Sequence, residues 1–73
     1  KPDEIVECTI SEFNEDGIKV FLKNNLPGVI PLQEIPGEFN IKKINEKIYA
    51  KITHINQREK LVYLSIKRLK NSP

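Results

Sequence analysis

The sequence predicts an all-β protein: a five-stranded Greek-key barrel with a short helical segment between the third and fourth strands. Three observations lead to this prediction. Apolar and polar residues alternate with a period of two, as in strands with one buried face, over Ile18–Leu22, Ile48–Ile52 and Val62–Ile66. Turn-forming residues separate these segments. One long connection follows the third strand, as in five-stranded Greek-key barrels.

The first strand is predicted over residues 4–14 and must contain a bend. Ile10 and Phe13 are three residues apart, so a regular strand would place them on opposite faces. Both can point inward only if the strand bulges between them, as strands do at barrel corners. We therefore expect a β-bulge between Ile10 and Phe13.

Short turns connect the other strands. Glu15-Asp16-Gly17 predicts a tight hairpin, with Gly17 available for a positive φ. In the second strand Ile18, Val20 and Leu22 are expected inward, and Lys19, Phe21 and Lys23 outward. Residues 23–27 close the second hairpin, the third strand follows over residues 28–32, and residues 58–60 form the last hairpin. In the last strand Tyr63, Ser65 and Lys67 are expected outward.

The stretch from Gln33 to Glu46 lacks sustained alternation and contains Pro36-Gly37. It predicts one or two helical turns that plug an end of the barrel, with Phe39 and Ile41 turned inward. The fourth strand is then expected over residues 47–56.

Length and composition indicate one domain over residues 1–73, which we expect to be a module excised from a longer multi-domain protein. No apolar run of membrane length occurs, so no membrane partner is expected. The single Cys8 cannot form an internal disulfide and fits a reducing compartment, so a cytoplasmic location is expected. The isolated domain is expected to be a monomer.

The net charge of +2 hides a strong polarity along the chain. Residues 1–38 hold three lysines against eight acids, a net charge of −5, whereas residues 39–73 hold nine basic residues against two acids, a net charge of +7. Such polarity can mark an anionic partner, or it can be an uneven but solvated surface.

Few residues in the chain could perform catalysis. His54 is the only histidine and has no second His or Cys at metal-ligand spacing. The three glycines form no phosphate-binding motif, and no nucleophile elbow is present. We therefore expect no enzymatic activity, no cofactor and no metal.

Four stretches, in order, resemble the S1 domain, an RNA-binding module with the oligonucleotide-binding (OB) fold. They are Cys8–Leu22, Gly28–Ile35, Ile44–Ile52 and the ending Leu64-Ser65-Ile66-Lys67. The Val29–Leu32 segment and the Lys67-Arg68-Leu69 ending look most like repeats of the bacterial small-subunit ribosomal protein S1. The resemblance implies an OB-fold, binding to RNA and a place in a ribosomal or translation protein.

The usual RNA contacts of that family are not kept. The family has two aromatics beside the first hairpin glycine, a His on the third strand, and an Asp and an Arg around the last hairpin. These positions hold Asp16, Lys19, Pro31, Asn56 and Leu61 here. RNA binding therefore cannot be inherited from the fold alone.

Other residues can supply a binding face. Single-stranded RNA is held by cations along its backbone and by aromatic faces on which bases stack. The outward stripe Lys19-Phe21-Lys23 combines both chemistries, and the last hairpin adds further polar groups. The predicted RNA-binding residues are Lys19, Phe21, Lys23, His54, Asn56, Arg58 and Lys60. Lys51, Lys67, Tyr49 and Tyr63 are further outward candidates.

Two functions lead, and a purely structural spacer is a third alternative. The first is a non-catalytic module that binds single-stranded messenger or ribosomal RNA weakly and with little sequence preference, at a dissociation constant on the order of 10⁻⁴–10⁻⁶ M. The second is a docking module whose RNA face has decayed, and which binds a protein partner or the ribosome through the acidic first half. Ribosomal proteins are further expected partners in either case.

Overall fold

The computed structural model describes residues 3–40 and 43–69. Five strands and three 3-10 turns occur in these ranges. The strands are β1 (Ile5–Asn14), β2 (Gly17–Phe21), β3 (Pro27–Pro31), β4 (Lys47–Asn56) and β5 (Leu61–Ser65). The turns are η1 (Lys23–Asn25), η2 (Leu32–Glu34) and η3 (Lys67–Leu69). Within the described ranges no helix is long and apolar enough to cross a membrane.

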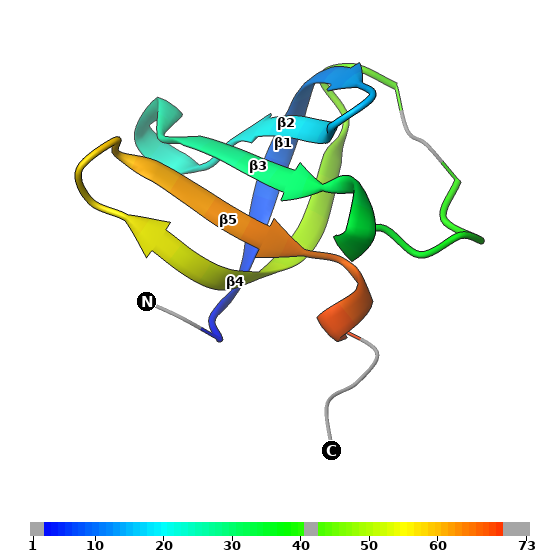
Figure 1. The fold of residues 1–73 in the computed structure, drawn as a ribbon. Coiled ribbons are helices and arrows are strands. Elements are labelled where there is room, and N and C mark those ends of the chain that lie inside the picture. Colours follow the sequence, from blue (N-terminus) through cyan, green and yellow to red (C-terminus); the bar gives the residue numbers. More distant parts are fainter. Residues whose placement is uncertain (1–2, 41–42, 70–73) are drawn as a thin grey trace.

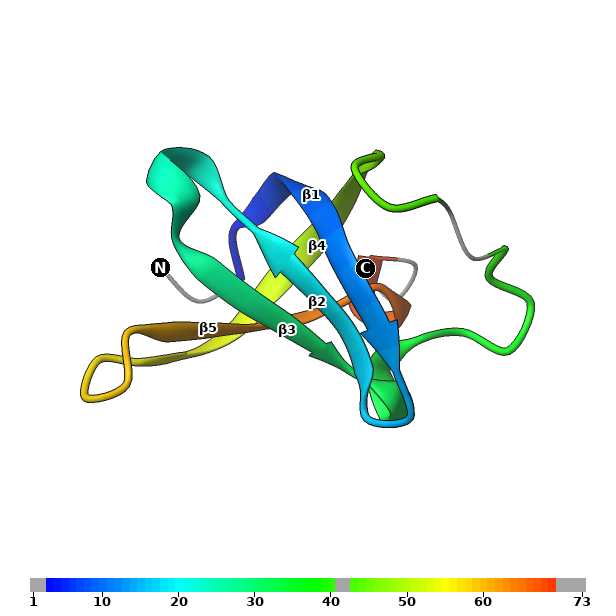
Figure 2. The same cartoon turned by 90° about the horizontal axis from the view of Figure 1, so that it is seen from above.

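The strands form one closed barrel in the order β1-β2-β3-β5-β4 (Figure 1). Neighbouring strands are antiparallel except β3 and β5, which run parallel. β1 pairs with β4 through its first half and with β2 through its second half. The β1–β2 turn and the β4–β5 turn lie at opposite ends of the barrel in both views (Figures 1 and 2). The predicted five-stranded barrel is confirmed.

The core follows the predicted two-residue period. Ile10, Ile18, Ile30 and Leu64 are at most 1% exposed and come from four different strands. Burial of each such side chain stabilises the fold by about 1.5–3 kcal/mol relative to leaving it exposed. Because the core fills the inward positions, the alternate side chains along β2 and β3 are left for the outer surface.

The predicted bulge in β1 is present. The register between β1 and β2 shifts between Ile10 and Glu12, which makes Ser11 the extra residue. Phe13 therefore pairs with Ile18 and packs against the core. The bulge resolves the conflict between the spacing of Ile10 and Phe13 and their common need for burial.

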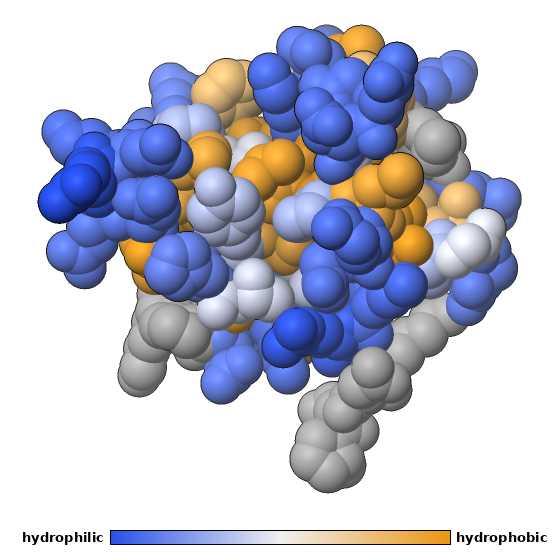
Figure 3. Space-filling model, in the orientation of Figure 1, coloured by the Kyte–Doolittle hydropathy of each residue, from blue (hydrophilic) through white to orange (hydrophobic). Residues whose placement is uncertain are grey.

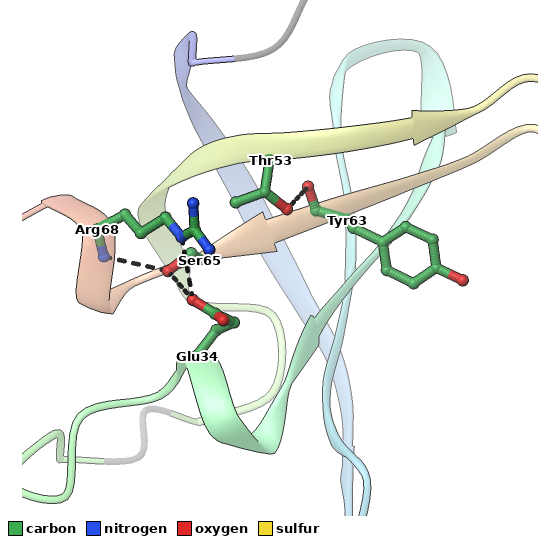
Figure 4. A network of polar contacts seen from close by, with 5 residues as sticks. All are labelled: Glu34, Thr53, Tyr63, Ser65 and Arg68. Atoms are coloured by element: carbon green, nitrogen blue, oxygen red, sulfur yellow. Dashed lines mark hydrogen bonds and ion pairs between the residues drawn. The ribbon is translucent and has the colours of Figure 1, made fainter.

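A second bulge, not expected from the sequence, lies in β4. The register with β5 shifts between Ile52 and His54, so that Thr53 is the extra residue. The Thr53 hydroxyl donates a hydrogen bond to the carbonyl oxygen of Tyr63 at 3.2 Å (Figure 4). As a result Ile55 packs against the core while His54 is exposed.

The connection between β3 and β4 contains the short helical segment predicted there. It has one 3-10 turn, η2, which begins at Leu32, and the remaining described residues form turns and irregular chain. Phe39 packs against the core as expected, and Ile35 does so too. Ile41 lies outside the described residues. Pro36 and Gly37 explain the shortness of the helical part, since neither residue favours continuation of a helix.

Ser65 is fully buried, so the prediction that it points outward beside Tyr63 is wrong. Its hydroxyl donates to Glu34 Oε1 at 2.6 Å and accepts from the backbone N–H of Arg68 at 3.1 Å (Figure 4). The Nε atom of Arg68 lies 3.5 Å from the same Glu34 oxygen. These contacts satisfy the buried hydroxyl and fasten η2 to β5 and η3.

Two further features belong to this junction. The backbone N–H of Ile66 donates to the carbonyl oxygen of Glu34 at 3.0 Å. The hydrogen bond from Ser65, aided by the charge of Arg68, lowers the pKa of Glu34 below its ordinary value despite partial desolvation. The Leu64-Ser65-Ile66-Lys67 ending thus has a structural role, because its hydrogen bonds join the end of β5 to the turn after β3.

Candidate nucleic-acid interface

Strand pairing lines up one row of side chains across the outer face of the barrel. Lys19 pairs with Val29, Val29 pairs with Tyr63, and Tyr63 pairs with His54. The row thus crosses β2, β3, β5 and β4. It exists because β3 and β5, which are far apart in the sequence, lie parallel to each other.

Aromatic rings sit in and beside this row. The rings of Tyr63 and His54 stack with centroids 5.8 Å apart and an interplanar angle of 27°. Phe21 lies next along β2, opposite Pro27, and is 43% exposed. Its ring is therefore accessible to a ligand, as the outward register of Phe21 predicts.

A groove runs over this face, with a volume of about 530 Å³. Its apolar lining includes Phe21, Pro27, Val29, Leu61 and Tyr63. Figure 3 shows hydrophobic side chains gathered over the middle of the face along which β3 and β5 run, bordered by hydrophilic ones. Ser11, Asn14, Asp16 and Lys19 supply polar groups to the same groove.

The β1–β2 turn forms one polar end of the groove. The side-chain oxygen of Asn14 accepts a hydrogen bond from the backbone N–H of Asp16 at 2.8 Å. The carbonyl oxygen of Asp16 accepts from the N–H of Leu32 at 2.9 Å. The turn is therefore held by its backbone and by Asn14, which fixes the position of Asp16 at the groove.

The β4–β5 turn carries two of the predicted cations. Arg58 and Lys60 are both exposed there. Asn56 holds this turn together, since its Oδ1 accepts from the N–H of Glu59 at 3.1 Å and its Nδ2 donates to Glu59 Oε1 at 3.4 Å. Asn56 thus has a structural part in presenting Arg58 and Lys60 to solvent.

Lys23 is not on the predicted stripe. The strand ends at Phe21, and Lys23 begins η1, in which Asn24 and Asn25 have φ angles of 63° and 60°. These left-handed residues turn the chain, and Lys23 lines a different groove together with Leu26. Lys23 therefore does not line the groove that holds Lys19 and Phe21, and its contact with RNA stays a prediction.

Of the further outward candidates, only Tyr63 lines the groove. Tyr63 lies at the centre of the row, whereas Tyr49 is 60% exposed and pairs with Glu7 of β1. Lys51 and Lys67 line a separate hollow with Arg68. Sequence reasoning did not foresee the contribution of Val29, Ser11 and Asn14 to the groove, because those positions become neighbours only through cross-strand pairing.

The charge along the groove is mixed. Lys19 lies opposite Glu12 of β1 in the strand register, and both side chains are exposed. Cationic attraction at Lys19 is weakened by this neighbouring acid. Among the described residues, no group of three or more His, Cys, Asp or Glu side chains could hold a metal ion.

Several solved structures share this fold. GSP13 from Bacillus subtilis superposes with a TM-score of 0.83 at 15% identity, covering 100% of this chain and 60% of GSP13. The α subunit of a/eIF2 from Pyrococcus horikoshii, in a complex with aDim2p and rRNA, gives 0.80 at 19% identity, covering 93% of this chain and 45% of that one.

RNase R of Mycoplasma genitalium, in complex with ribose-methylated single-stranded RNA, gives a TM-score of 0.71 at 21% identity. The match covers 88% of this chain but only 13% of the ribonuclease. The fold is an OB barrel of the S1 type. No protein-family model matches the sequence, and no curated protein matches it. At these identities the likeness establishes the S1-type fold, and the site must be argued from the residues of this chain.

Proposed function

We propose that this S1-type barrel is a non-catalytic module that binds single-stranded RNA along the groove over β2, β3 and β5. The observation that most supports the proposal is the joint presence of Phe21, Tyr63 and Lys19 in one groove. Exposed aromatic faces beside a cation are what bases and phosphates of an unpaired strand require.

The groove supports weak binding. Phe21 and Tyr63 each offer a face for one base, and a stacked base contributes roughly 1–3 kcal/mol. Lys19 contacts a phosphate between them, and Arg58 and Lys60 attract the strand from the β4–β5 turn. Because Glu12 lies beside Lys19, the dissociation constant is expected on the order of 10⁻⁴–10⁻⁶ M, with little sequence preference along the aromatic part.

The matched structures support the same function. One was solved with rRNA in the complex and another with single-stranded RNA bound. Three of the positions at which S1 domains have their usual contacts line the groove here, namely Asp16, Lys19 and Leu61. We further propose that the module acts in the cytoplasm as one repeat of a ribosomal or translation protein, where weak contacts of linked repeats add up.

A second candidate function is docking to a protein. One end of the barrel has an apolar groove lined by Phe13, Leu32, Ile35 and Phe39, among others, and Leu32 is 59% exposed. Asp16 and Glu15 stand in the adjoining turn, so a partner with an apolar and basic segment would suit this end. This groove shares Asn14 with the proposed RNA face and is otherwise lined by different residues.

Titration of the 73-residue chain with a uridine hexamer tests the proposal. We expect amide chemical shifts to change at Lys19, Phe21, Val29, Tyr63 and His54, and to fade as salt rises. Tyr63→Leu should weaken binding roughly fivefold or more, the equivalent of at least ~1 kcal/mol of stacking. Tyr49→Leu is the matched control, since Tyr49 is exposed on a part of β4 that pairs with β1.

The two candidate functions give different results. If no amide shifts with RNA at low salt, the RNA proposal is wrong. Equal weakening by Tyr63→Leu and Tyr49→Leu would instead place RNA outside the groove. In the first case the protein-docking groove around Leu32 becomes the leading site.

A further inference from the structure

We infer that Asp16 makes one end of the RNA groove selective for guanine. The inference rests on the proposed RNA function and adds a base preference to it. The aromatic part of the groove accepts any base face, because every base has one. The turn at its end presents different chemistry.

The carboxylate of Asp16 is available to a ligand. Asp16 is exposed and lines the groove. The hydrogen bonds that fix the turn use its backbone N–H and carbonyl oxygen, which bond to Asn14 and Leu32. Within residues 3–40 and 43–69, no hydrogen bond or ion pair occupies the Asp16 side chain.

The Asp16 carboxylate at the end of the groove favours the base of a nucleotide over its phosphate. It repels phosphate, so a base edge is favoured there over the backbone. An ionised carboxylate only accepts hydrogen bonds, and it accepts two parallel ones best. Guanine offers two adjacent donors, the N1–H and the N2 amino group, on its Watson–Crick edge.

The other bases match the carboxylate less well. Cytosine and adenine each offer one amino donor beside an acceptor nitrogen. Uracil offers one N–H between two carbonyl oxygens, which the carboxylate repels. We therefore expect guanine to bind best at this end and uracil to bind worst.

The acceptor end and the aromatic part can act on different nucleotides. Asp16 precedes β2 and Phe21 ends it, so they are at most about 17 Å apart at ~3.3 Å per residue. The extended strand between them separates the two ends of the groove. One strand can therefore stack on Phe21 or Tyr63 while a base farther along it meets Asp16.

The test compares a uridine hexamer with hexamers in which one uridine is replaced by guanine, cytosine or adenine. A single guanine avoids the assembly of guanine-rich strands. We expect the guanine hexamer to bind about fivefold more tightly than the uridine hexamer, the lower end for a bidentate base contact because the site is exposed.

Two variants isolate the carboxylate. Asp16→Asn should bring the guanine-to-uridine ratio close to one, since the amide presents a donor as well as an acceptor. Its backbone hydrogen bonds are unchanged, so the turn is kept. Glu15→Gln is the control: it removes the same charge from the same turn at an exposed residue outside the groove lining, and should keep the preference.

Each outcome decides the question. Loss of the preference in Asp16→Asn alone supports the inference. Equal binding of all hexamers by the unmodified chain overturns the inference while leaving the RNA function standing. A preference that survives in Asp16→Asn overturns it too. Failure of the unmodified chain to bind any hexamer overturns both the RNA function and the inference.

Discussion

The hydroxyl of Ser65 donates a 2.6 Å hydrogen bond to the carboxylate of Glu34, which lies 31 residues earlier in the chain. This bond joins the turn after β3 to the end of β5, the two strands whose parallel pairing closes the barrel. The groove lies across the same pair of strands. The Ser65–Glu34 hydrogen bond therefore supports both the closure of the barrel and the shape of the groove.

Replacement of Ser65 by Ala should lower the free energy of unfolding by about 1–3 kcal/mol. The change removes the donor to Glu34 and the acceptor for the N–H of Arg68, both at a fully buried site. Urea unfolding followed by circular dichroism measures the loss. Ser11→Ala is the control, because Ser11 is a half-buried strand serine with no side-chain hydrogen bond to the described residues. An equal loss of unfolding free energy in Ser65→Ala and Ser11→Ala would mean that the hydrogen bonds of Ser65 do not stabilise the fold.

The pKa of Glu34 predicts a pH dependence of stability. The hydrogen bond from Ser65 and the charge of Arg68 lower this pKa from the ordinary value of 4.5. The ionised carboxylate therefore stabilises the fold above pH 4.5, and this contribution is lost as the pH falls through the lowered pKa. Unfolding in urea between pH 7 and pH 3 should show the chain and its Glu34→Gln variant converging below pH 4.5. A constant difference across that range would contradict the prediction.

Gly17 should not tolerate a side chain. Its φ is 138°, and a Cβ atom there would lie 2.0 Å from the backbone oxygen of Ile30. Gly17→Ala should therefore cost at least about 3 kcal/mol, from backbone strain and overpacking together. Gly37→Ala is the matched control, since a Cβ there meets nothing within 4 Å, and should stay within ~0.5 kcal/mol. Thermal unfolding of both variants separates the cases, and a stable Gly17→Ala protein would refute the assigned turn geometry.

Cys8 should be unreactive while the protein is folded. It is 2% exposed, and burial together with the nearby charge of Glu7 raises its pKa to about 11. Because the thiolate is the nucleophile, alkylation by iodoacetamide at pH 7 should be slow and should follow unfolding as urea is added. Rapid modification without urea would show that the start of β1 opens easily.

The strands were predictable because burial on one face leaves a two-residue period in the sequence. The same reasoning predicts the bulge near Ser11, because Ile10 and Phe13 are both apolar but would lie on opposite faces of a regular strand. The bulge at Thr53 left a similar signal, the odd spacing of Ile52 and Ile55, but the regular pattern before it concealed the change of phase. The local apolar pattern thus predicts which face of a strand is buried. It predicts a bulge only where the spacing of two large apolar residues does not fit a regular strand.

The site was less predictable because it depends on partners distant in sequence. Lys19 and Tyr63 meet only through Val29, since β3 and β5 pair although the fourth strand separates them in the chain. Alternation places Ser65 on the outer face, and it does not reveal the hydrogen bond to Glu34, which belongs to another element. Lys23 lies outside the groove because β2 already ends at Phe21, an ending that the alternation does not reveal, since Leu22 continues the apolar pattern.

The separation of Lys19 from Lys23 gives a direct test of which cation meets RNA. Lys19 lines the groove, whereas Lys23 lines another one beside Leu26. Lys19→Gln should reduce the slope of the logarithm of the binding constant against the logarithm of salt concentration by about 0.7, the value for one phosphate contact on a single strand. Lys23→Gln should leave that slope unchanged, although both variants lose one positive charge. Fluorescence anisotropy with a uridine hexamer at several salt concentrations gives both slopes. If the two variants lower the slope equally, RNA senses only the total charge, and Lys19 makes no contact of its own.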